Sequence, residues 1–272
     1  MYDLESARAD GVTQLGHPSL IWGLAEALRF PTEFVSSYAW EALVPAARAD
    51  RARTVLVLPG FMATDAMTGQ LRRSLGRDGH RVHPAGLGRM VGLTDAILDG
   101  ALIRVEELAH REGPVTVVGW SFGGVLARWL AHERPTLVEH VVTVGSPWRA
   151  EGEVTRATTM FQASARRHGI SERAVEVIGT VRTPLPCPLT AIYSTTDGLV
   201  PWRACTAEEG PTCENVPVPS SHVGLMHNPL VLTAVRDRVA QDPPLARRFS
   251  WRDALVRPWQ HTTEPAHPGE TR

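Results

Sequence analysis

The sequence predicts an α/β fold in which a mostly parallel central sheet carries helices on both faces. Short β-branched runs, such as residues 54–58 and 115–118, alternate with longer segments of helical spacing along most of the chain. Such alternation is typical of a parallel sheet wrapped by helices. With 272 residues, the chain has the length of one large domain and can bury a sizeable core.

The balance of charges excludes several classes of partner. The chain carries 28 basic and 29 acidic residues and a formal net charge of −1, so no strong field points to nucleic acid or to an anionic membrane. No apolar run reaches the roughly 18–20 residues that a membrane span needs, and the first residues lack the pattern of a signal peptide. We therefore expect a cytoplasmic protein without a membrane span and without a nucleic-acid partner. The oligomeric state stays open.

The cysteines and histidines of the sequence indicate neither a disulfide framework nor a metal site. The three cysteines, Cys187, Cys205 and Cys213, are too few and odd in number for a disulfide framework. Pairing of Cys205 with Cys213 stays open, although the lack of an export signal disfavours it. The 11 histidines are scattered, and no pair has the spacing of metal ligands. The sequence therefore predicts no metal site.

Strands and helices are expected in alternating order through the middle of the chain. Continuous β-rich runs predict strands at residues 54–58, 81–83, 115–118, 141–144, 189–193 and 214–218. Helical spacing, with capping residues and stops at glycine or proline, predicts helices at residues 65–75, 94–111, 122–133 and 229–240.

Residues 1–53 are expected to form a helical N-terminal extension. Leu20, Ile21, Leu24 and Leu28 have the spacing of one helix face. We expect this apolar stripe to pack on the protein's own sheet, and coverage of a pocket or of a partner is the alternative.

The core is expected over residues 54–240 and a C-terminal tail over residues 241–272. Within the core, residues 148–183 are polar and helical without a strand, which predicts an insertion that lies over the site as a cap or lid. Proline and polar residues dominate the tail, which predicts a segment partly draped on the surface and frayed at its end.

The stretch around Ser121 combines a strand, a sharp turn and a helix. The β-branched run at 115–118 leads directly into Gly-Trp-Ser-Phe-Gly, and an apolar helix-like segment follows. In this context the G-x-S-x-G pattern predicts a nucleophile elbow. Gly119 and Gly123 supply the residues without Cβ that a strained turn needs. The turn places the serine hydroxyl beside a helix N-terminus, where a developing anion is favoured.

A serine hydroxyl becomes a good nucleophile only when a base removes its proton and a third group orients that base. In elbow folds the acid and then the histidine follow the serine, each on a loop after a later strand. Asp197 follows the expected strand at 189–193 and is the candidate acid. Glu208 and Glu209 are the alternatives, deeper in a charged loop.

The candidate base is His222, which follows the expected strand at 214–218. His227 is the rival, but it lies at the entry to the expected last helix. Because functional loops of an open parallel sheet gather at the carboxyl ends of its strands, we expect Ser121, Asp197 and His222 to lie together.

An oxyanion hole needs two backbone donors aimed at the developing negative oxygen. The elbow supplies the N–H group of Phe122, the residue after the nucleophile. The second donor is expected in the loop after the strand at 54–58, where Gly60 permits a tight turn. Phe61 is the first candidate and Met62 the alternative.

Four stretches together resemble the α/β-hydrolase superfamily on its esterase/lipase-like side. They are Leu58-Pro59-Gly60-Phe61, Gly119-Trp120-Ser121-Phe122-Gly123-Gly124, Thr196-Asp197-Gly198-Leu199-Val200-Pro201 and Ser221-His222-Val223-Gly224. The resemblance covers residues 54–240. It implies an eight-stranded, mostly parallel sheet, a Ser121–Asp197–His222 triad, and no metal or organic cofactor. The early loop departs from the His-Gly-Gly-Gly oxyanion motif, which argues against a hormone-sensitive-lipase-like member.

Apolar residues near the expected site predict a pocket for acyl chains or aromatic esters. The apolar residues around the site are Phe61, Met62, Trp120, Phe122, Trp148 and Leu199, and of these Met62, Trp120, Trp148 and Leu199 are the candidate substrate-binding residues. Arg89, in a Gly-rich loop, is a further candidate that contacts either a substrate carboxylate or the N-terminal helix. The loop lacks the acidic partner of a dinucleotide site.

The leading hypothesis is a serine hydrolase that cleaves a small-molecule or lipid-like carboxylic ester through an acyl-enzyme. An acyltransferase or a thioesterase would use the same triad and is the first alternative. A non-catalytic, hydrolase-like binding protein is the second, although a binding module has no reason to carry all three residues of the triad.

Overall fold

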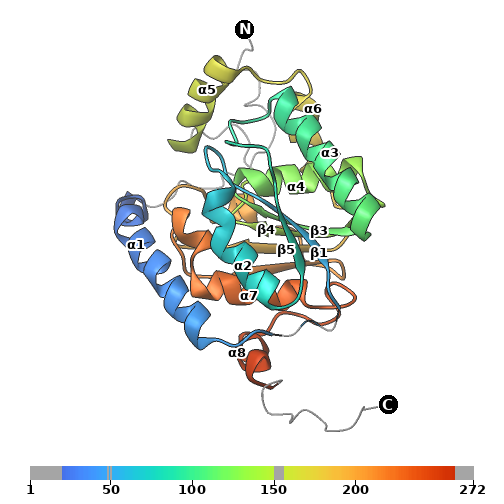
Figure 1. Ribbon diagram of the computed structural model, residues 1–272. Coiled ribbons are helices and arrows are strands. Elements are labelled where there is room, and N and C mark those ends of the chain that lie inside the picture. Colours follow the sequence, from blue (N-terminus) through green and yellow to red (C-terminus); the bar gives the residue numbers. More distant parts are fainter. Residues whose placement is uncertain (1–19, 48, 50, 150–155, 261–272) are drawn as a thin grey trace.

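The computed structural model describes residues 20–47, 49, 51–149 and 156–260. In this part of the chain the strands form one parallel sheet in the order β2-β1-β3-β4-β5-β6 (Figure 1). The strands are β1 (Thr54–Leu58), β2 (Arg81–Pro84), β3 (Val115–Trp120), β4 (Val138–Val144), β5 (Leu189–Tyr193) and β6 (Cys213–Pro217). Every predicted strand is confirmed within a few residues.

The expectation of eight strands is wrong for the described residues, which hold six. The reason lies ahead of β1, where residues 20–43 form a helix. Central strands β1 and β3 are buried along their whole length. Their Val- and Leu-rich sequences suit a sheet with both faces covered.

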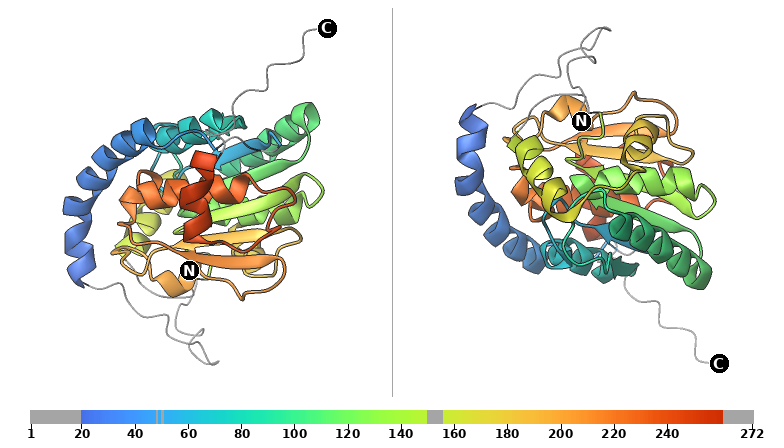
Figure 2. Two further views of the ribbon diagram at one scale, coloured as in Figure 1. Left: turned by 90° about the horizontal axis from the view of Figure 1, so that it is seen from below. Right: turned by 90° about the horizontal axis from the view of Figure 1, so that it is seen from above.

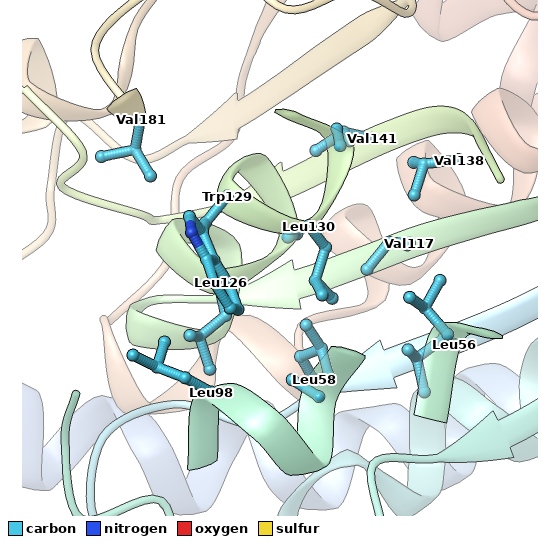
Figure 3. Close-up of a cluster of buried hydrophobic side chains, with 14 of the residues drawn as sticks. Leu56, Leu58, Leu98, Val117, Leu126, Trp129, Leu130, Val138, Val141 and Val181 are labelled. Carbon is cyan, nitrogen blue, oxygen red and sulfur yellow. The ribbon is translucent and has the colours of Figure 1, made fainter. Parts of the chain in front are cut away.

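Helices cover both faces of the sheet, as predicted. One face carries α3 (Asp95–Glu112), α4 (Phe122–Glu133) and α6 (Ala174–Thr180), and the other carries α2 (Gly69–Arg77) and α7 (Pro229–Val239). Alternate strand residues point to opposite faces. Figure 3 shows the first core cluster, in which side chains of the strands pack against those of two helices. The strand residues are Leu56, Leu58, Val117 and Val141, and the helix residues include Leu126 and Leu130 of α4 and Leu98 of α3.

The N-terminal helix α1 (Leu20–Leu43) runs for 24 residues with Pro31 inside it. Figure 2 shows it curving along the outer edge of the molecule, and it contacts α7 and the short helix η4 (Val223–Met226).

The expected packing of the apolar stripe of α1 on the sheet is wrong. Leu20, Ile21, Leu24 and Leu28 are 71–78% exposed, whereas the buried residues of this helix are polar. The side that faces the protein carries carboxylates that bond to loop amides, described below, and these contacts turn the apolar side outward.

Residues between β4 and β5 form α5 (Arg156–His168) and α6. Ser164 Oγ donates to the carbonyl of Val91 at 2.7 Å, and Ser171 N donates to the carbonyl of Leu93 at 2.7 Å. The insertion is therefore fastened to the loop ahead of α3. Its role as a cap stays a prediction.

The chain beyond α7 contains a further helix, α8 (Trp251–Gln260), so the helix predicted at 229–240 is not the last. The rings of Phe249 and Trp251 pack edge to face with their centroids 4.8 Å apart, and the guanidinium carbon of Arg238 lies 5.2 Å from the Phe249 ring centroid. These contacts hold the start of the tail against α7. The end predicted to fray, residues 261–272, lies outside the described residues. Among the helices described, none combines the length and the apolar character that crossing a bilayer requires.

Candidate active site

Ser121 lies at the turn between β3 and α4 with φ 52° and ψ −120°, a strained conformation for a residue other than glycine. Its N–H group donates to the carbonyl of Val144 at 2.8 Å. A Cβ at Gly119 would lie 2.3 Å from the Gly123 carbonyl oxygen, and one at Gly123 would lie 2.3 Å from that of Leu58. The turn therefore requires glycine on both sides of the serine.

The structure brings Ser121, His222 and Asp197 into one hydrogen-bonded chain. Ser121 Oγ lies 3.0 Å from Nε2 of His222, and Nδ1 of His222 lies 2.6 Å from Oδ2 of Asp197. All three side chains are buried. Because the ionised carboxylate only accepts hydrogen bonds, Nδ1 carries the proton and Nε2 is free to accept the serine proton.

The surroundings of His222 stabilise its protonated form. Burial alone would lower the pKa of His222, but the charge of Asp197, its hydrogen bond and the charge of Glu26 together raise this pKa above the ordinary value. The imidazole is therefore a stronger base than a free histidine side chain.

Asp197 is held in place by its own loop. Its Oδ1 atom accepts the N–H groups of Leu199 and Val200, both at 2.8 Å, which leaves Oδ2 for His222. Leu199, predicted to bind substrate, thus contributes a backbone contact to the acid, and its side chain is half-buried.

The rival acid and base residues lie elsewhere. Glu208 and Glu209 line a separate cavity that includes none of the three chained residues. His227 packs against Phe30 and Phe34 of α1, with ring centroids 5.9 and 4.9 Å apart. Burial lowers the pKa of His227.

The backbone that follows β1 lies against the elbow, since a Cβ at Gly123 would lie 2.6 Å from the carbonyl oxygen of Pro59. The N–H group of Met62 donates to the carbonyl of Met90 at 2.8 Å and is therefore engaged, whereas no such contact involves the N–H group of Phe61 among the described backbone bonds. The Arg89 guanidinium donates to the carbonyl of Met62 at 2.8 Å. Arg89 thus fastens this loop.

Three aromatic rings gather beside the elbow. The ring centroid of Phe61 lies 6.4 Å from that of Phe122 and 5.5 Å from that of Phe161 of α5. The centroids of Phe122 and Phe161 are 6.5 Å apart. Met62 is exposed beside them. Phe161 was not among the predicted site residues, because helical spacing within a polar insertion does not reveal which residue faces the site.

The two tryptophans predicted to bind substrate are both buried. Trp120 is 5% exposed, packs with the core on the α7 face and donates its Nε1–H to the carbonyl of His222 at 3.2 Å. Trp148 lies under the guanidinium of Arg128, 3.8 Å from the ring centroid, in the wall of a cavity of about 440 Å³. Ser121 does not line that cavity. Burial in the core on the α7 face removes Trp120 from substrate contact, whereas substrate contact by Trp148 stays a prediction.

Polar residues of α1 reach the same region and were also missed. Glu26, Arg29 and Glu33 form hydrogen bonds to the loops that carry Asp197 and His222. Their i, i+3, i+7 spacing places them on one helix face, which is the signal that the sequence offered.

The described residues hold no group of three or more His, Cys, Asp or Glu side chains arranged to bind a metal. Cys187, Cys205 and Cys213 are all free thiols, which answers the open question of the Cys205–Cys213 pair. Burial raises the pKa of the Cys187 thiol to about 12, so this thiol is not reactive near neutral pH.

The family model described as the alpha/beta hydrolase fold matches residues 23–164, just over half of the chain. The chain belongs to the α/β-hydrolase family, as its four motifs indicated. No curated protein sequence matches it significantly.

Solved structures with the same fold include several that are named as lipases, esterases or hydrolases. Lipase B of Aspergillus fumigatus superposes with a TM-score of 0.56 at 16% identity, over 81% of this chain and 64% of that one. The chain thus spans less than two thirds of the length of that lipase. The pyrethroid hydrolase PytH, solved with BIF, gives 0.51 at 19% identity over 72% of this chain and 100% of that one. Est1E of Butyrivibrio proteoclasticus gives 0.50 at 14% identity over 71% and 89%.

Proposed function

We propose that the protein is a serine hydrolase that cleaves carboxylic esters through Ser121, His222 and Asp197. The observation that carries this proposal is the buried hydrogen-bonded chain from Ser121 Oγ to Asp197 Oδ2. It starts at a strained elbow residue that faces the N-terminus of α4. Structural neighbours named as lipases and hydrolases agree with this assignment.

In the acylation step, Ser121 Oγ attacks the ester carbonyl while its proton moves to Nε2 of His222. Asp197 holds the imidazole and stabilises the imidazolium that forms. The N–H groups of Phe122 and Phe61 stabilise the negative oxygen of the tetrahedral intermediate. Collapse breaks the ester C–O bond, and His222 returns the proton to the leaving alkoxide.

In the deacylation step, a water molecule attacks the acyl-enzyme and its proton moves to His222. Collapse of the second intermediate releases the carboxylic acid and returns the proton to Ser121 Oγ. The chemistry thus needs no residue beyond the triad and the two backbone donors.

The substrate class is an uncharged ester with an apolar acyl or aromatic group. The rings of Phe61, Phe122 and Phe161, with Met62 beside them, support this choice. We expect Phe161→Ala to lower kcat/KM for long-chain esters about tenfold more than for acetate esters, because the lost contact is apolar. Ile103→Ala, at an exposed position of α3, is the matched control and should change neither.

A series of p-nitrophenyl esters of increasing chain length tests the proposal directly. Wild type should hydrolyse at least one member, and Ser121→Ala and His222→Ala should lose this activity by roughly three orders of magnitude or more. His110→Ala, at an exposed position of α3, should keep it. Full activity of Ser121→Ala would contradict the proposal.

The same assay distinguishes hydrolysis from acyl transfer. A hydrolase releases the free acid even when an alcohol acceptor is present, whereas a transferase converts most of the acyl group to the new ester. Predominant ester formation would replace the proposed hydrolase by an acyltransferase with the same triad. Inertness of every ester would favour the non-catalytic alternative.

A further inference from the structure

We propose that Glu26 of helix α1 is a positioning residue that ties the loop of Asp197 to the loop of His222. The inference rests on the proposed function and deepens it. One carboxylate oxygen, Oε1, accepts the N–H group of Gly198 at 2.9 Å and the N–H group of His222 at 2.8 Å. A single atom of helix α1 therefore joins the residue after the acid to the base itself.

The environment of Glu26 suits a fixed acceptor. The residue is only 7% exposed, and its second oxygen, Oε2, lies 3.4 Å from the N–H group of Val223. Hydrogen bonds to a buried charged acceptor are stronger than those between neutral groups. Loss of this acceptor leaves two buried amides without their partner, and the two loops lose their common anchor.

Glu33, two turns further along α1, makes a second set of bonds to the histidine loop. Its Oε1 atom accepts from Ser220 Oγ at 3.0 Å, from Ser221 N at 2.9 Å and from Asn228 Nδ2 at 3.1 Å, while Oε2 accepts from Ser221 Oγ. The contacts of Glu33 hold the backbone around His222, and those of Glu26 reach both loops.

Arg29 completes the contact on the side of the acid loop. Its guanidinium donates to the carbonyl of Thr196 at 2.8 Å and to Oγ1 of the same residue at 3.0 Å. Asp197 is thus bracketed by residues that α1 holds, Thr196 before it and Gly198 after it.

The close approach of α1 depends on two glycines. A Cβ at Gly198 would lie 2.5 Å from the backbone of Trp22, and one at Gly224 would lie 1.7 Å from Oε2 of Glu33. Both distances are far below van der Waals contact. A larger residue at position 198 would therefore push the backbone of α1 away, and one at position 224 would displace the carboxylate of Glu33. The loops and the helix are therefore shaped for each other.

Glu26 also acts on the base through its charge. The groups that face His222 are Ser121 from the elbow, Asp197 from the acid loop and Glu26 from α1. Both carboxylates raise the pKa of His222 against the opposing effect of burial. A neutral residue at position 26 should therefore lower this pKa, whereas a contact of purely structural importance would not change it.

The test compares Glu26→Gln and Glu26→Asp with Glu41→Gln as a matched control on the same helix. Glu41 bonds Gln70 and lies away from both loops. The pKa of the His222 imidazole is measured by NMR titration, and kcat and KM are measured with the p-nitrophenyl esters described above.

In Glu26→Gln we expect the His222 pKa to fall, because the charge of Glu26 is one of the influences that raise it in the wild-type protein. We expect kcat to fall about tenfold with KM nearly unchanged, because the acid–base pair is displaced rather than the substrate pocket. Glu26→Asp keeps the charge on a shorter side chain, so kcat should fall while the His222 pKa stays near that of wild type. Glu41→Gln should match wild type in both measurements.

An unchanged His222 pKa in a folded Glu26→Gln protein would overturn the proposal. If that variant does not fold, wild-type kcat in Glu26→Asp would overturn it. The NMR titration needs no substrate, so the result for the role of Glu26 can be distinguished from the result for the esterase assignment. An inactive wild type whose His222 pKa falls in Glu26→Gln would contradict the esterase assignment and support the role of Glu26.

Discussion

Nε1 of Trp120 lies 3.2 Å from the carbonyl oxygen of His222, so the residue just before the elbow serine holds the residue that would activate it. The indole also packs against Gly60, where a Cβ would approach its ring to 3.0 Å. One buried side chain thus contacts the histidine loop and the loop after β1. Trp120 keeps the parts of the site in register without lining it.

Trp120→Phe should separate the hydrogen bond from the packing, because phenylalanine fills most of the space and lacks the N–H group. We expect a loss of about 0.5–1.5 kcal/mol in stability and a several-fold lower kcat with KM little changed. Chemical denaturation and ester kinetics measure the two effects. A KM that rises while kcat stays constant would instead indicate that Trp120 contacts the substrate.

Gly119→Ala should disrupt the elbow, because the new Cβ would lie 2.3 Å from the backbone oxygen of Gly123. We expect a loss of several kcal/mol in the free energy of unfolding together with loss of ester hydrolysis. Gly76→Ala in α2 is the control, since its Cβ would meet nothing within 4 Å. The control should gain up to about 1 kcal/mol. Equal stability of the two variants, measured by urea denaturation, would argue against a sterically closed elbow.

The pH dependence of ester hydrolysis should report His222. General-base catalysis needs the neutral imidazole, and the pKa of His222 is raised. The acid limb of kcat/KM should therefore lie above the ordinary histidine value of about 6.5. Asp197→Asn removes the largest of the raising influences, so its acid limb should move to lower pH while kcat falls by roughly 10⁴-fold. An acid limb below about 6.5 in wild type would contradict the raised pKa.

The stability of the fold should depend on pH through a different histidine. His140 is fully buried in β4, and burial, with help from the charges of Arg53 and Arg238, lowers its pKa to about 3. Between pH 3 and about 6.5 the imidazole of His140 is protonated in the unfolded chain but not in the folded protein. The free energy of unfolding therefore falls as the pH falls. The slope from this group is about 1.4 kcal/mol per pH unit.

His140→Gln should reduce the slope of the unfolding free energy against pH by about 1.4 kcal/mol per pH unit, whatever its effect on absolute stability. The measurement is the free energy of unfolding between pH 4 and 6.5, with His110→Gln as the exposed control. His222, with its raised pKa, contributes a constant amount below about 6.5 and does not obscure the comparison. An unchanged slope in His140→Gln would show that His140 does not govern the acid sensitivity.

The sheet and its helices were predictable because their signals are local. β-Branched runs bounded by glycine and proline marked β1, β3 and β5, and capping residues marked helices such as α3. The order of serine, acid and histidine on successive loops then pointed to one edge of the sheet. Parallel topology places Ser121, Asp197 and His222 at the same edge of the sheet, and the loop after β6 then reaches back to the elbow.

The orientation of α1 could not be predicted from its periodicity. An apolar stripe ordinarily faces the core, but here the bonds of Glu26 to Gly198 and His222 join positions more than 170 residues apart. No local pattern encodes such contacts. The prediction that Trp120 lines the substrate pocket overlooked the alternation of side chains along β3. Trp120 is two residues after Val118, so both side chains lie on the α7 face of the sheet.

The most direct test of the esterase assignment is covalent labelling of the protein with a fluorophosphonate, followed by peptide mass spectrometry. We expect the serine oxygen to displace fluoride and a single adduct to map to Ser121. Labelling should be lost in Ser121→Ala and strongly slowed in His222→Ala. An adduct on another residue, or undiminished labelling of Ser121→Ala, would contradict the assignment of Ser121 as the nucleophile.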